Sequence, residues 1–241
     1  MTENSPETPK RRMPLNPLQA GHHQLTKDES RYLLKALRLT EGEKIEVFDG
    51  QGFFALATLH RIDEGQPYLD VQEPQEAPKP DHELYLAVAT PKGDRADWLV
   101  EKITEIGASG LIWLQTERSV VTPKPGSKKF ERWARLADSA ARQSRRVRVP
   151  KIQGPMSLEE LSEQEFQNRL VASPIKTDNA LPKGALQGRT VVVIGPEGGF
   201  TDHELEQLKN SGYNLLWLSP HILRTETAAI AAAAVLIAHP S

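Results

Sequence analysis

The chain has 241 residues, a formal net charge of −2 and no cysteine, and 38% of its residues are hydrophobic. This length allows one large domain or two modest ones, and the composition suits a globular protein with a buried core. The lack of cysteine excludes disulfides, thiolate zinc sites and a cysteine nucleophile. No apolar run approaches the ~18 residues of a membrane helix, and the polar N-terminus lacks the apolar core of a secretory signal. We therefore expect a soluble, cytoplasmic protein with no membrane contact.

Two segments are typical of connections rather than of folded structure. Residues 1–14 are polar and proline-rich, which predicts a flexible tail. Residues 75–83 combine proline with charge and show no apolar periodicity, which predicts a linker. The expected domains are therefore residues 15–74 and residues 84–241.

The first domain is expected to be small and rich in β-structure. Lys44–Phe48 alternates polar and apolar side chains like a half-buried strand. Asp49-Gly50 then marks a tight turn into a return strand, Phe53–Leu59. A short helix is expected within Leu25–Leu39, capped by Asp28 or Ser30.

From Leu84 onward, strands alternate with helices. This alternation predicts a parallel α/β sheet covered on both faces, with ligands bound beyond the carboxyl ends of its strands. The strands are expected at 84–90, 111–115, 169–173, 191–194 and 215–218, and the helices at 96–106, 128–145, 158–168, 202–210 and 225–238.

A glycine-rich turn, Gly195-Pro-Glu-Gly-Gly199, follows the expected strand Val191–Ile194 directly. Thr201 or Asp202 can cap the helix that comes next. Glycines let a backbone approach a ligand closely, and a helix N-terminus offers free N–H groups. A tight strand-to-helix connection is the simpler explanation of the turn alone. The pattern is neither GxGxxG nor GxxxxGK[ST], so it does not predict a dinucleotide or ATP site.

A second turn precedes the last helix, which is rich in alanine. Thr225 is a suitable cap for this helix, and Glu226 is favoured by the helix dipole. Arg224 is a cation at a helix start, where the dipole disfavours positive charge. Local structure does not explain this residue, so Arg224 is a candidate for function.

Residues 118–151 form a basic run, in which eleven lysines and arginines stand against Glu131 and Asp138. A solvated helix face is the usual meaning of charged residues, but a run of one sign within a near-neutral protein favours contact with a nucleic-acid backbone. The seven histidines show neither HExxH nor an i,i+4 pair, so no metal site is predicted.

Short motifs along nearly the whole chain resemble the 16S rRNA uracil-N3 methyltransferases of the SPOUT class. Each motif alone is moderately specific, but their order and spacing together are specific. The matching segments are Lys35–Leu39, Gly42, Val47–Gly50, Pro91–Arg95, Glu101-Lys102, Thr104–Gly107, Glu117–Ser119, Ala141–Ser144, Arg146, Val149-Pro150, Gly195–Gly199 and Ile222–Ala228.

The resemblance implies a small N-terminal PUA-like β-barrel that binds RNA, followed by a SPOUT methyltransferase domain with a parallel sheet and a deep C-terminal trefoil knot. It also implies a homodimer, S-adenosylmethionine as cofactor, and methylation of N3 of a specific uridine in 16S rRNA of the small ribosomal subunit. Two alternatives remain open, namely a non-catalytic RNA-binding or ribosome-assembly factor on this fold and a SPOUT enzyme with another RNA target, such as a tRNA.

The resemblance also assigns residues. Arg224 would stabilise the developing uracil oxyanion, and Glu226 would orient Arg224 or accept the N3 proton. The cofactor pocket would be lined by Ala172, Ser173, Ile194, Gly195, Glu197, Gly198, Gly199, Leu218, Ser219, Leu223, Thr225, Thr227 and Ala228. RNA would be bound by Arg11, Arg12, Lys92, Arg95, Arg118, Arg132, Arg142, Arg145 and Arg146. The chain departs from the family at Ser219 and His221, where glycine and arginine are usual.

Overall fold

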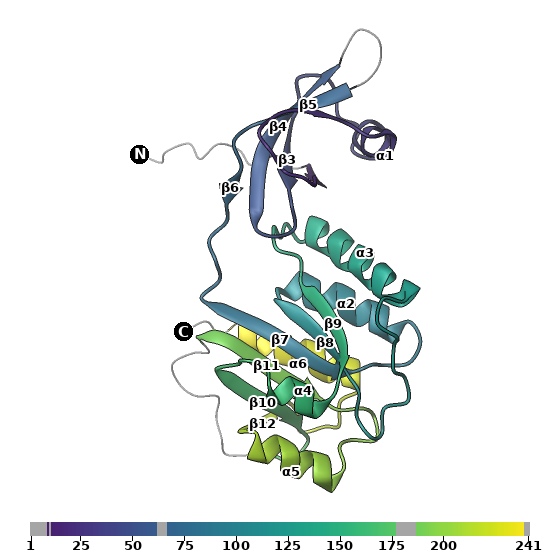
Figure 1. The fold of residues 1–241 in the computed structure, drawn as a ribbon, viewed down its shortest axis with the longest axis vertical. Coiled ribbons are helices and arrows are strands. Elements are labelled where there is room, and N and C mark those ends of the chain that lie inside the picture. The colour runs from purple at the N-terminus through teal and green to yellow at the C-terminus, as the bar shows by residue number, and fades with distance from the viewer. Residues whose placement is uncertain (1–8, 10, 62–66, 177–186, 239–241) are drawn as a thin grey trace. The chain divides into compact units, whose positions relative to one another are not determined.

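The computed structural model describes residues 9, 11–61, 67–176 and 187–238. The chain forms two compact units (Figure 1). The N-terminal unit comprises residues 1–79 together with 145–148, and the C-terminal unit comprises residues 80–144 and 149–241. The segment 145–148 therefore belongs to the N-terminal unit, although the sequence analysis placed it in the second domain.

The N-terminal unit is a mixed sheet in the order β1-β3-β4-β5-β2, with β6 paired to β4. The pair β1–β3 is parallel, and the other pairs are antiparallel. The helical segment is confirmed but is capped by Thr26, whose side chain accepts a hydrogen bond from Glu29 N. The strands are β1 Arg12–Pro14, β2 Gly21–Gln24, β3 Lys44–Phe48, β4 Phe53–Arg61, β5 Pro67–Val71 and β6 Gln75–Glu76, and the helices are α1 Lys27–Arg31 and the π-turn η1 Tyr32–Ala36.

Strand β1 corrects the predicted tail. Residues 12–14 pair with β3, and the Met13 side chain is buried in the core of the unit beside Ile45 and Val47. A three-residue strand whose partner lies 34 residues away leaves no local periodicity in the sequence. Strand β6 likewise takes residues 75–76 out of the predicted linker.

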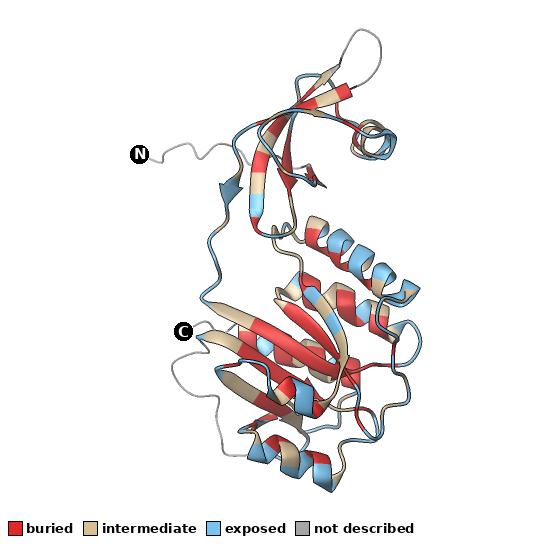
Figure 2. Cartoon of the chain, viewed as in Figure 1, coloured by how far each residue is buried: buried red, intermediate tan, exposed pale blue. Residues whose placement is uncertain are grey.

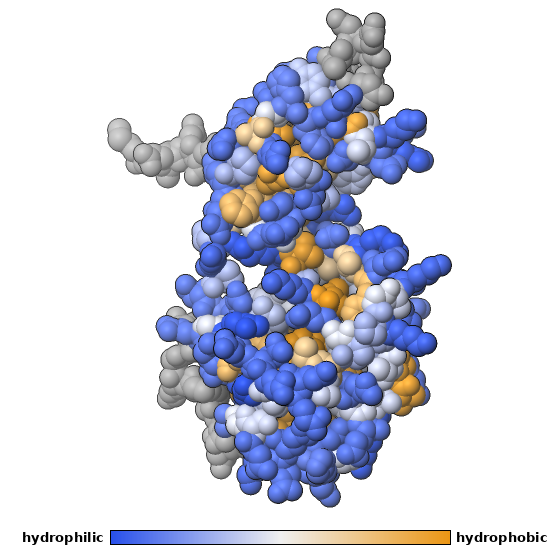
Figure 3. Space-filling view, in the orientation of Figure 1, coloured by the Kyte–Doolittle hydropathy of each residue, from blue (hydrophilic) through white to orange (hydrophobic). Residues whose placement is uncertain are grey.

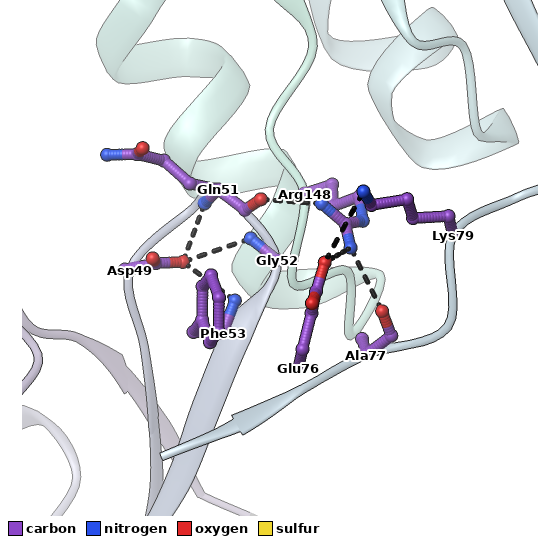
Figure 4. Close-up of polar contacts among 8 residues, drawn as sticks. All are labelled: Asp49, Gln51, Gly52, Phe53, Glu76, Ala77, Lys79 and Arg148. Atoms are coloured by element: carbon purple, nitrogen blue, oxygen red, sulfur yellow. Dashed lines mark hydrogen bonds and ion pairs between the residues drawn. The ribbon is translucent and has the colours of Figure 1, made fainter.

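The predicted hairpin after β3 is confirmed, and residue 148 is packed against it (Figure 4). The Asp49 side chain accepts hydrogen bonds from the backbone N–H groups of Gln51, Gly52 and Phe53 at 2.7–3.0 Å. The Arg148 guanidinium donates to the carbonyl oxygens of Gln51 and Ala77 at 2.6 and 2.9 Å. Gly52 has a φ of +121°, a conformation that L side chains rarely adopt, so the turn favours glycine there.

The C-terminal unit has a six-stranded, wholly parallel sheet in the order β12-β10-β11-β7-β8-β9, which confirms the predicted α/β class. Its strands are β7 His82–Ala89, β8 Gly110–Leu114, β9 Lys151–Met156, β10 Asn168–Ser173, β11 Gly188–Ile194 and β12 Asn214–Trp217. Its helices are α2 Arg95–Ile106, α3 Lys128–Gln143, α4 Leu158–Ser162, α5 Asp202–Asn210 and α6 Thr225–Ala238.

Alternating side chains on these strands supply two cores, one on each face of the sheet. Leu84, Leu86 and Val88 of β7 pack with residues of α2, α3 and α6. Tyr85 and Ala87 point to the other face and pack with residues of α4 and α5. Figure 2 shows the central strands largely buried, and Figure 3 shows a mostly hydrophilic surface on the visible face. Helix α6 packs on α2 through alanines, which permit a close approach.

Three expectations for this unit were wrong. Strand β9 was not predicted. It contains Gly154 and Pro155, which disfavour a strand, but it is an edge strand, where proline is tolerated. Helix α4 ends at Ser162 rather than at residue 168. Helix α3 ends at Gln143, and Arg145 beyond it has a φ of +61° that a helix cannot continue. No described helix is long and apolar enough to span a bilayer.

Candidate functional site

The carboxyl ends of three neighbouring strands, β10, β11 and β12, border a cavity of about 420 Å³. The glycine loop, Gly195–Gly199, forms one of its walls, and the loop Leu218–Leu223, hereafter the second wall, forms another. The cavity lies where ligands of parallel α/β sheets bind, and its volume suits a small organic molecule.

The cavity contains nearly all of the predicted cofactor residues. Those that line it are Ala172, Ser173, Ile194, Gly195, Glu197, Gly198, Gly199, Leu218, Ser219, Leu223, Thr225 and Ala228. Thr227 is exposed on α6 and is not among the lining residues. The other lining residues were not predicted from the sequence: Val171, Pro174, Ile175, Pro196, Phe200, Leu205, Leu215, His221 and Ile222. Pro174, Ile175 and Pro196 stand within two residues of the end of a predicted strand, and this position is the signal that could have found them.

The rim of the cavity is apolar and exposed. Ile175, Leu205, Leu215 and Ile222 line the cavity and are among the exposed large apolar side chains of the described residues. Ile222 is 90% exposed and Ile175 is 68% exposed. A bound molecule with an apolar part would cover these side chains, so the rim indicates a binding site.

The glycine loop is shaped by its own backbone and by α6. Gly199 N donates to the carbonyl of Pro196 at 2.8 Å, and Gly199 has a φ of +68°, which favours glycine. The Thr225 hydroxyl donates to the carbonyl of Gly195 at 3.0 Å. This bond ties the start of α6 to the loop. Helix α6 begins at Thr225 itself, so the cap position is Arg224, one residue earlier than the sequence suggested.

A charged cluster lies beside the glycine loop. The Nη1 atom of Arg95, in the first turn of α2, lies 3.4 Å from Glu197 and 3.5 Å from Glu226. The Glu226 side chain is only 5% exposed, and its Oε2 atom has no hydrogen-bond partner among the described residues. Arg224 is exposed, and no ion pair or hydrogen bond of its side chain is found in the described part of the chain. The structure therefore brings Arg95, predicted for RNA, next to the predicted catalytic Glu226.

Four more predicted RNA-binding residues of this unit have varied surroundings. Lys92 is exposed on the loop before α2. Arg132 is ion-paired with Asp97, and its side chain is 59% exposed. Arg142 is half-buried in the last turn of α3. Arg118 is exposed but donates a hydrogen bond to the glycine loop.

The N-terminal unit corrects one predicted RNA contact. The Arg12 side chain is 4% exposed, pairs with Glu46 and lies over the Phe48 ring, so a phosphate cannot reach it. Burial lowers the pKa of Arg12, and the adjacent Glu46 carboxylate opposes this shift. Arg146 is half-buried, and burial lowers its pKa to about 10.

Two other predicted contacts in this unit remain accessible. Arg11 is partly exposed and pairs with Glu43 at 2.8 Å. Arg145 is exposed and donates to the Pro9 carbonyl at 3.1 Å. No cluster of three metal-ligating side chains occurs within the described residues.

Comparison with known families defines the class of this protein. Residues 77–237 match the RNA methyltransferase domain, and residues 25–72 match the RNA methyltransferase PUA domain. The chain belongs to this RNA methyltransferase family. The matches confirm the family that the sequence motifs resembled and the PUA assignment of the N-terminal unit.

Individual relatives carry more particular names. The chain is 33% identical over 220 residues to the ribosomal RNA small subunit methyltransferase E of Bacillus subtilis, with 85% of each chain covered. A methyltransferase of Legionella pneumophila in complex with the bound cofactor SAM has a TM-score of 0.80 and 27% identity, with 95% of this chain and 96% of that chain covered. A ribosomal RNA small subunit methyltransferase E from Neisseria gonorrhoeae, bound to S-adenosyl methionine, has a TM-score of 0.78 with the same identity and coverage.

Proposed function

We propose that this protein transfers a methyl group from S-adenosylmethionine to N3 of a specific uridine in 16S rRNA. The observation that carries the proposal is the cavity of about 420 Å³ at the ends of β10–β12, which is lined by all the predicted cofactor residues except Thr227. Arg224 and Glu226 flank the lining residue Thr225 in the chain. Relatives named ribosomal RNA small subunit methyltransferase E, one of them bound to S-adenosyl methionine, support the same conclusion.

The cavity fits this cofactor chemically. The exposed rim residues Ile175 and Ile222 offer an apolar surface to a purine ring. The glycine loop offers backbone groups that can come close to a ligand, because Gly195 and Gly198 have no side chains. When bound, S-adenosylmethionine supplies an electrophilic methyl group on a sulfonium. We place Thr227 outside this pocket.

Methylation of uracil N3 requires loss of the N3 proton and stabilisation of the negative charge that develops on the ring oxygens. Arg224 is exposed and suits this charge stabilisation. Glu226 pairs with Arg95 at 3.5 Å, and no contact with Arg224 is found among the described residues. These contacts favour Glu226 as the proton acceptor over Glu226 as the residue that orients Arg224. With S-adenosylmethionine bound, the sulfonium would supply the methyl group to N3, and Glu226 would take up the N3 proton.

The target uridine must leave its stack before N3 can be reached, so the substrate is a flipped or single-stranded nucleotide. We place the RNA backbone against the members of the predicted set that are at least partly exposed: Arg11, Lys92, Arg132, Arg142 and Arg145. Replacing both Arg132 and Arg142 with glutamate should weaken RNA binding and flatten its salt dependence. An unchanged salt dependence of RNA binding would mean that these residues form a solvated helix face and do not contact RNA.

We also propose a cytoplasmic homodimer whose C-terminal segment forms a trefoil knot, as the SPOUT resemblance implies. Exposed apolar side chains on α2 and α6, Trp98 and Val235, support a surface that a second copy covers. Light scattering should give twice the mass of one chain. A monomer that methylates RNA at full rate would contradict the dimer.

The function is tested by incubating the protein and S-adenosylmethionine with small ribosomal subunits, naked 16S rRNA and tRNA, and then mapping 3-methyluridine by mass spectrometry. We expect the modified base in 16S rRNA only. Methylation of tRNA alone would give the protein a different RNA target. If calorimetry detects no binding of S-adenosylmethionine or its demethylated product, with or without RNA, the non-catalytic RNA-binding alternative holds.

A further inference from the structure

A loop from a non-adjacent strand reaches the glycine loop. Strand β7 lies between β8 and β11 in the sheet, yet residues 115–119, which follow β8, contact the residues that follow β11. The Arg118 Nη1 atom donates to the carbonyl of Gly198 at 2.8 Å and to the carbonyl of Phe200 at 3.3 Å. The guanidinium therefore holds both sides of the turn that closes the cavity wall.

A buried carboxylate joins the same two loops. The Oε2 atom of Glu204 accepts from Thr201 N at 2.8 Å in the capping box of α5. Its Oε1 atom accepts from Glu117 N at 2.8 Å. Glu204 is only 4% exposed, so its charge is satisfied by backbone donors rather than by water. The residue thus caps a helix and anchors the neighbouring loop with one side chain.

The anchoring loop is ordered by its own side chains. Thr116 N donates to the Ser119 hydroxyl at 3.0 Å, and the two hydroxyls lie 2.8 Å apart. This turn fixes the backbone on both sides of Arg118. The turn that carries Arg118 is therefore held by its own hydrogen bonds and places the guanidinium beside the glycine loop.

The basic run suggested that Arg118 binds RNA, whereas its contacts indicate that it supports the glycine loop. The Cδ atom of Arg118 lies 3.5 Å from the position that a Cβ on Gly198 would occupy, so the side chain packs along the loop. Gly198 and Phe200 both line the cavity. Any shift of Arg118 therefore moves a wall of the cofactor site.

We propose that Arg118 and Glu204 are positioning residues that set the affinity for the cofactor by bracing the glycine loop. The proposal rests on the proposed function for the identity of the ligand, S-adenosylmethionine. Neither residue touches the reacting atoms. Arg118 is accordingly removed from the predicted RNA contacts.

The test measures binding of S-adenosylhomocysteine by calorimetry and binding of 16S rRNA by filter retention. Arg118→Ala should lower the affinity for S-adenosylhomocysteine about tenfold, because hydrogen bonds from charged donors to carbonyls are stronger than those between neutral groups. Arg118→Lys, which retains one charged donor, should recover part of this loss. Lys209→Ala, which removes an exposed charge from α5 in the same unit, is the matched control and should change neither affinity.

RNA affinity separates the two roles of Arg118. Under our proposal, Arg118→Ala keeps the RNA affinity of the wild type within about twofold, whereas a phosphate contact would lower the RNA affinity and its salt slope. Loss of RNA affinity with unchanged S-adenosylhomocysteine affinity would overturn the proposal.

Hydrogen exchange in the ligand-free protein tests the brace without any cofactor. In Arg118→Ala and Glu204→Gln, the amides of residues 197–201 should exchange faster than in the wild type, whereas those of strand β7 should not change. Unchanged exchange at residues 197–201 would overturn the brace. If the wild type binds no S-adenosylhomocysteine but the exchange result holds, the proposed function fails and the brace stands.

Discussion

The two walls of the cavity are held in different ways. The glycine loop receives hydrogen bonds from Arg118 and Thr225, and its Glu197 is paired with Arg95. In the second wall, the one hydrogen bond found in the described part of the chain that involves a side chain is local, from His221 N to the Ser219 hydroxyl at 3.1 Å. The second wall also carries Ile222, which is 90% exposed.

This difference indicates how each wall responds to change. A braced backbone cannot move away from an added atom, so substitutions in the glycine loop should cost cofactor affinity. A wall with few fixed contacts can adjust, so substitutions there should be absorbed unless they remove a group that acts on the substrate. The cavity is thus expected to have one preformed wall and one that is ordered by its ligand.

The largest effect is expected at Arg224, immediately after the second wall. Arg224→Ala should lower kcat about 100-fold or more, because a charge that stabilises the transition state is lost. Binding of S-adenosylhomocysteine should stay at the wild-type level, since Arg224 does not line the cavity. Arg224→Lys, which keeps the charge but not the planar guanidinium, should be intermediate. A collapse of cofactor affinity in Arg224→Ala would show that the residue belongs to the pocket and not to the chemistry.

Gly195→Ala should break the braced wall. A Cβ at this position would lie 2.9 Å from the Phe200 ring, and the loop is tied from both sides. Overpacking of this kind typically costs 1–3 kcal/mol, so we expect S-adenosylhomocysteine to bind about tenfold more weakly. The control is Gly212→Ala after α5, which strains the backbone at a φ of +81° but adds a Cβ that would meet no atom within 4 Å and does not line the cavity. Equal losses in both variants would mean that general instability, and not the shape of the wall, controls the affinity.

Much of this site was predictable because its residues follow strand ends. The apolar runs Val191–Ile194 and Leu215–Leu218 indicate strands, and parallel strands gather their carboxyl ends at one edge. The order and spacing of the motifs then indicated a methyltransferase family, and the family implied the reaction. The anomalous cation at a helix start, Arg224, was detectable from the sequence alone because local capping rules fail there.

The bracing residues were not predictable, because their roles come from contacts between distant segments. Arg118 and Gly198 are 80 residues apart, and Arg118 stands in a run of basic residues that is typical of a nucleic-acid surface. Arg12 pairs with Glu46 inside the N-terminal unit, a role that a tail-like composition conceals. Edge strand β9 was missed for the related reason that proline is acceptable only once the position of the strand in the sheet is known.

A smaller effect is expected where the two walls meet at the start of α6. Thr225→Val keeps the shape of a buried side chain but removes the hydroxyl that donates to the Gly195 carbonyl. The loss of one neutral hydrogen bond is worth about 1 kcal/mol, so S-adenosylhomocysteine should bind about fivefold more weakly. The matched substitution Thr227→Val, at an exposed position outside the cavity, should leave this affinity unchanged. A fivefold loss of affinity in both variants would mean that the effect comes from a change in the helix and not from loss of the hydrogen bond between Thr225 and Gly195.

The smallest effect is expected at Ser219, in the middle of the second wall. Ser219→Gly restores the residue that the family usually has there and removes the hydroxyl that accepts from His221 N. If the second wall takes its shape from the ligand, the loss of this local bond is absorbed, and S-adenosylhomocysteine affinity should change by no more than about twofold. Calorimetry on this variant beside Gly195→Ala compares one small change in each wall under the same conditions. A tenfold change at Ser219 would mean that the serine turn is itself a fixed part of the pocket, and that both walls are preformed.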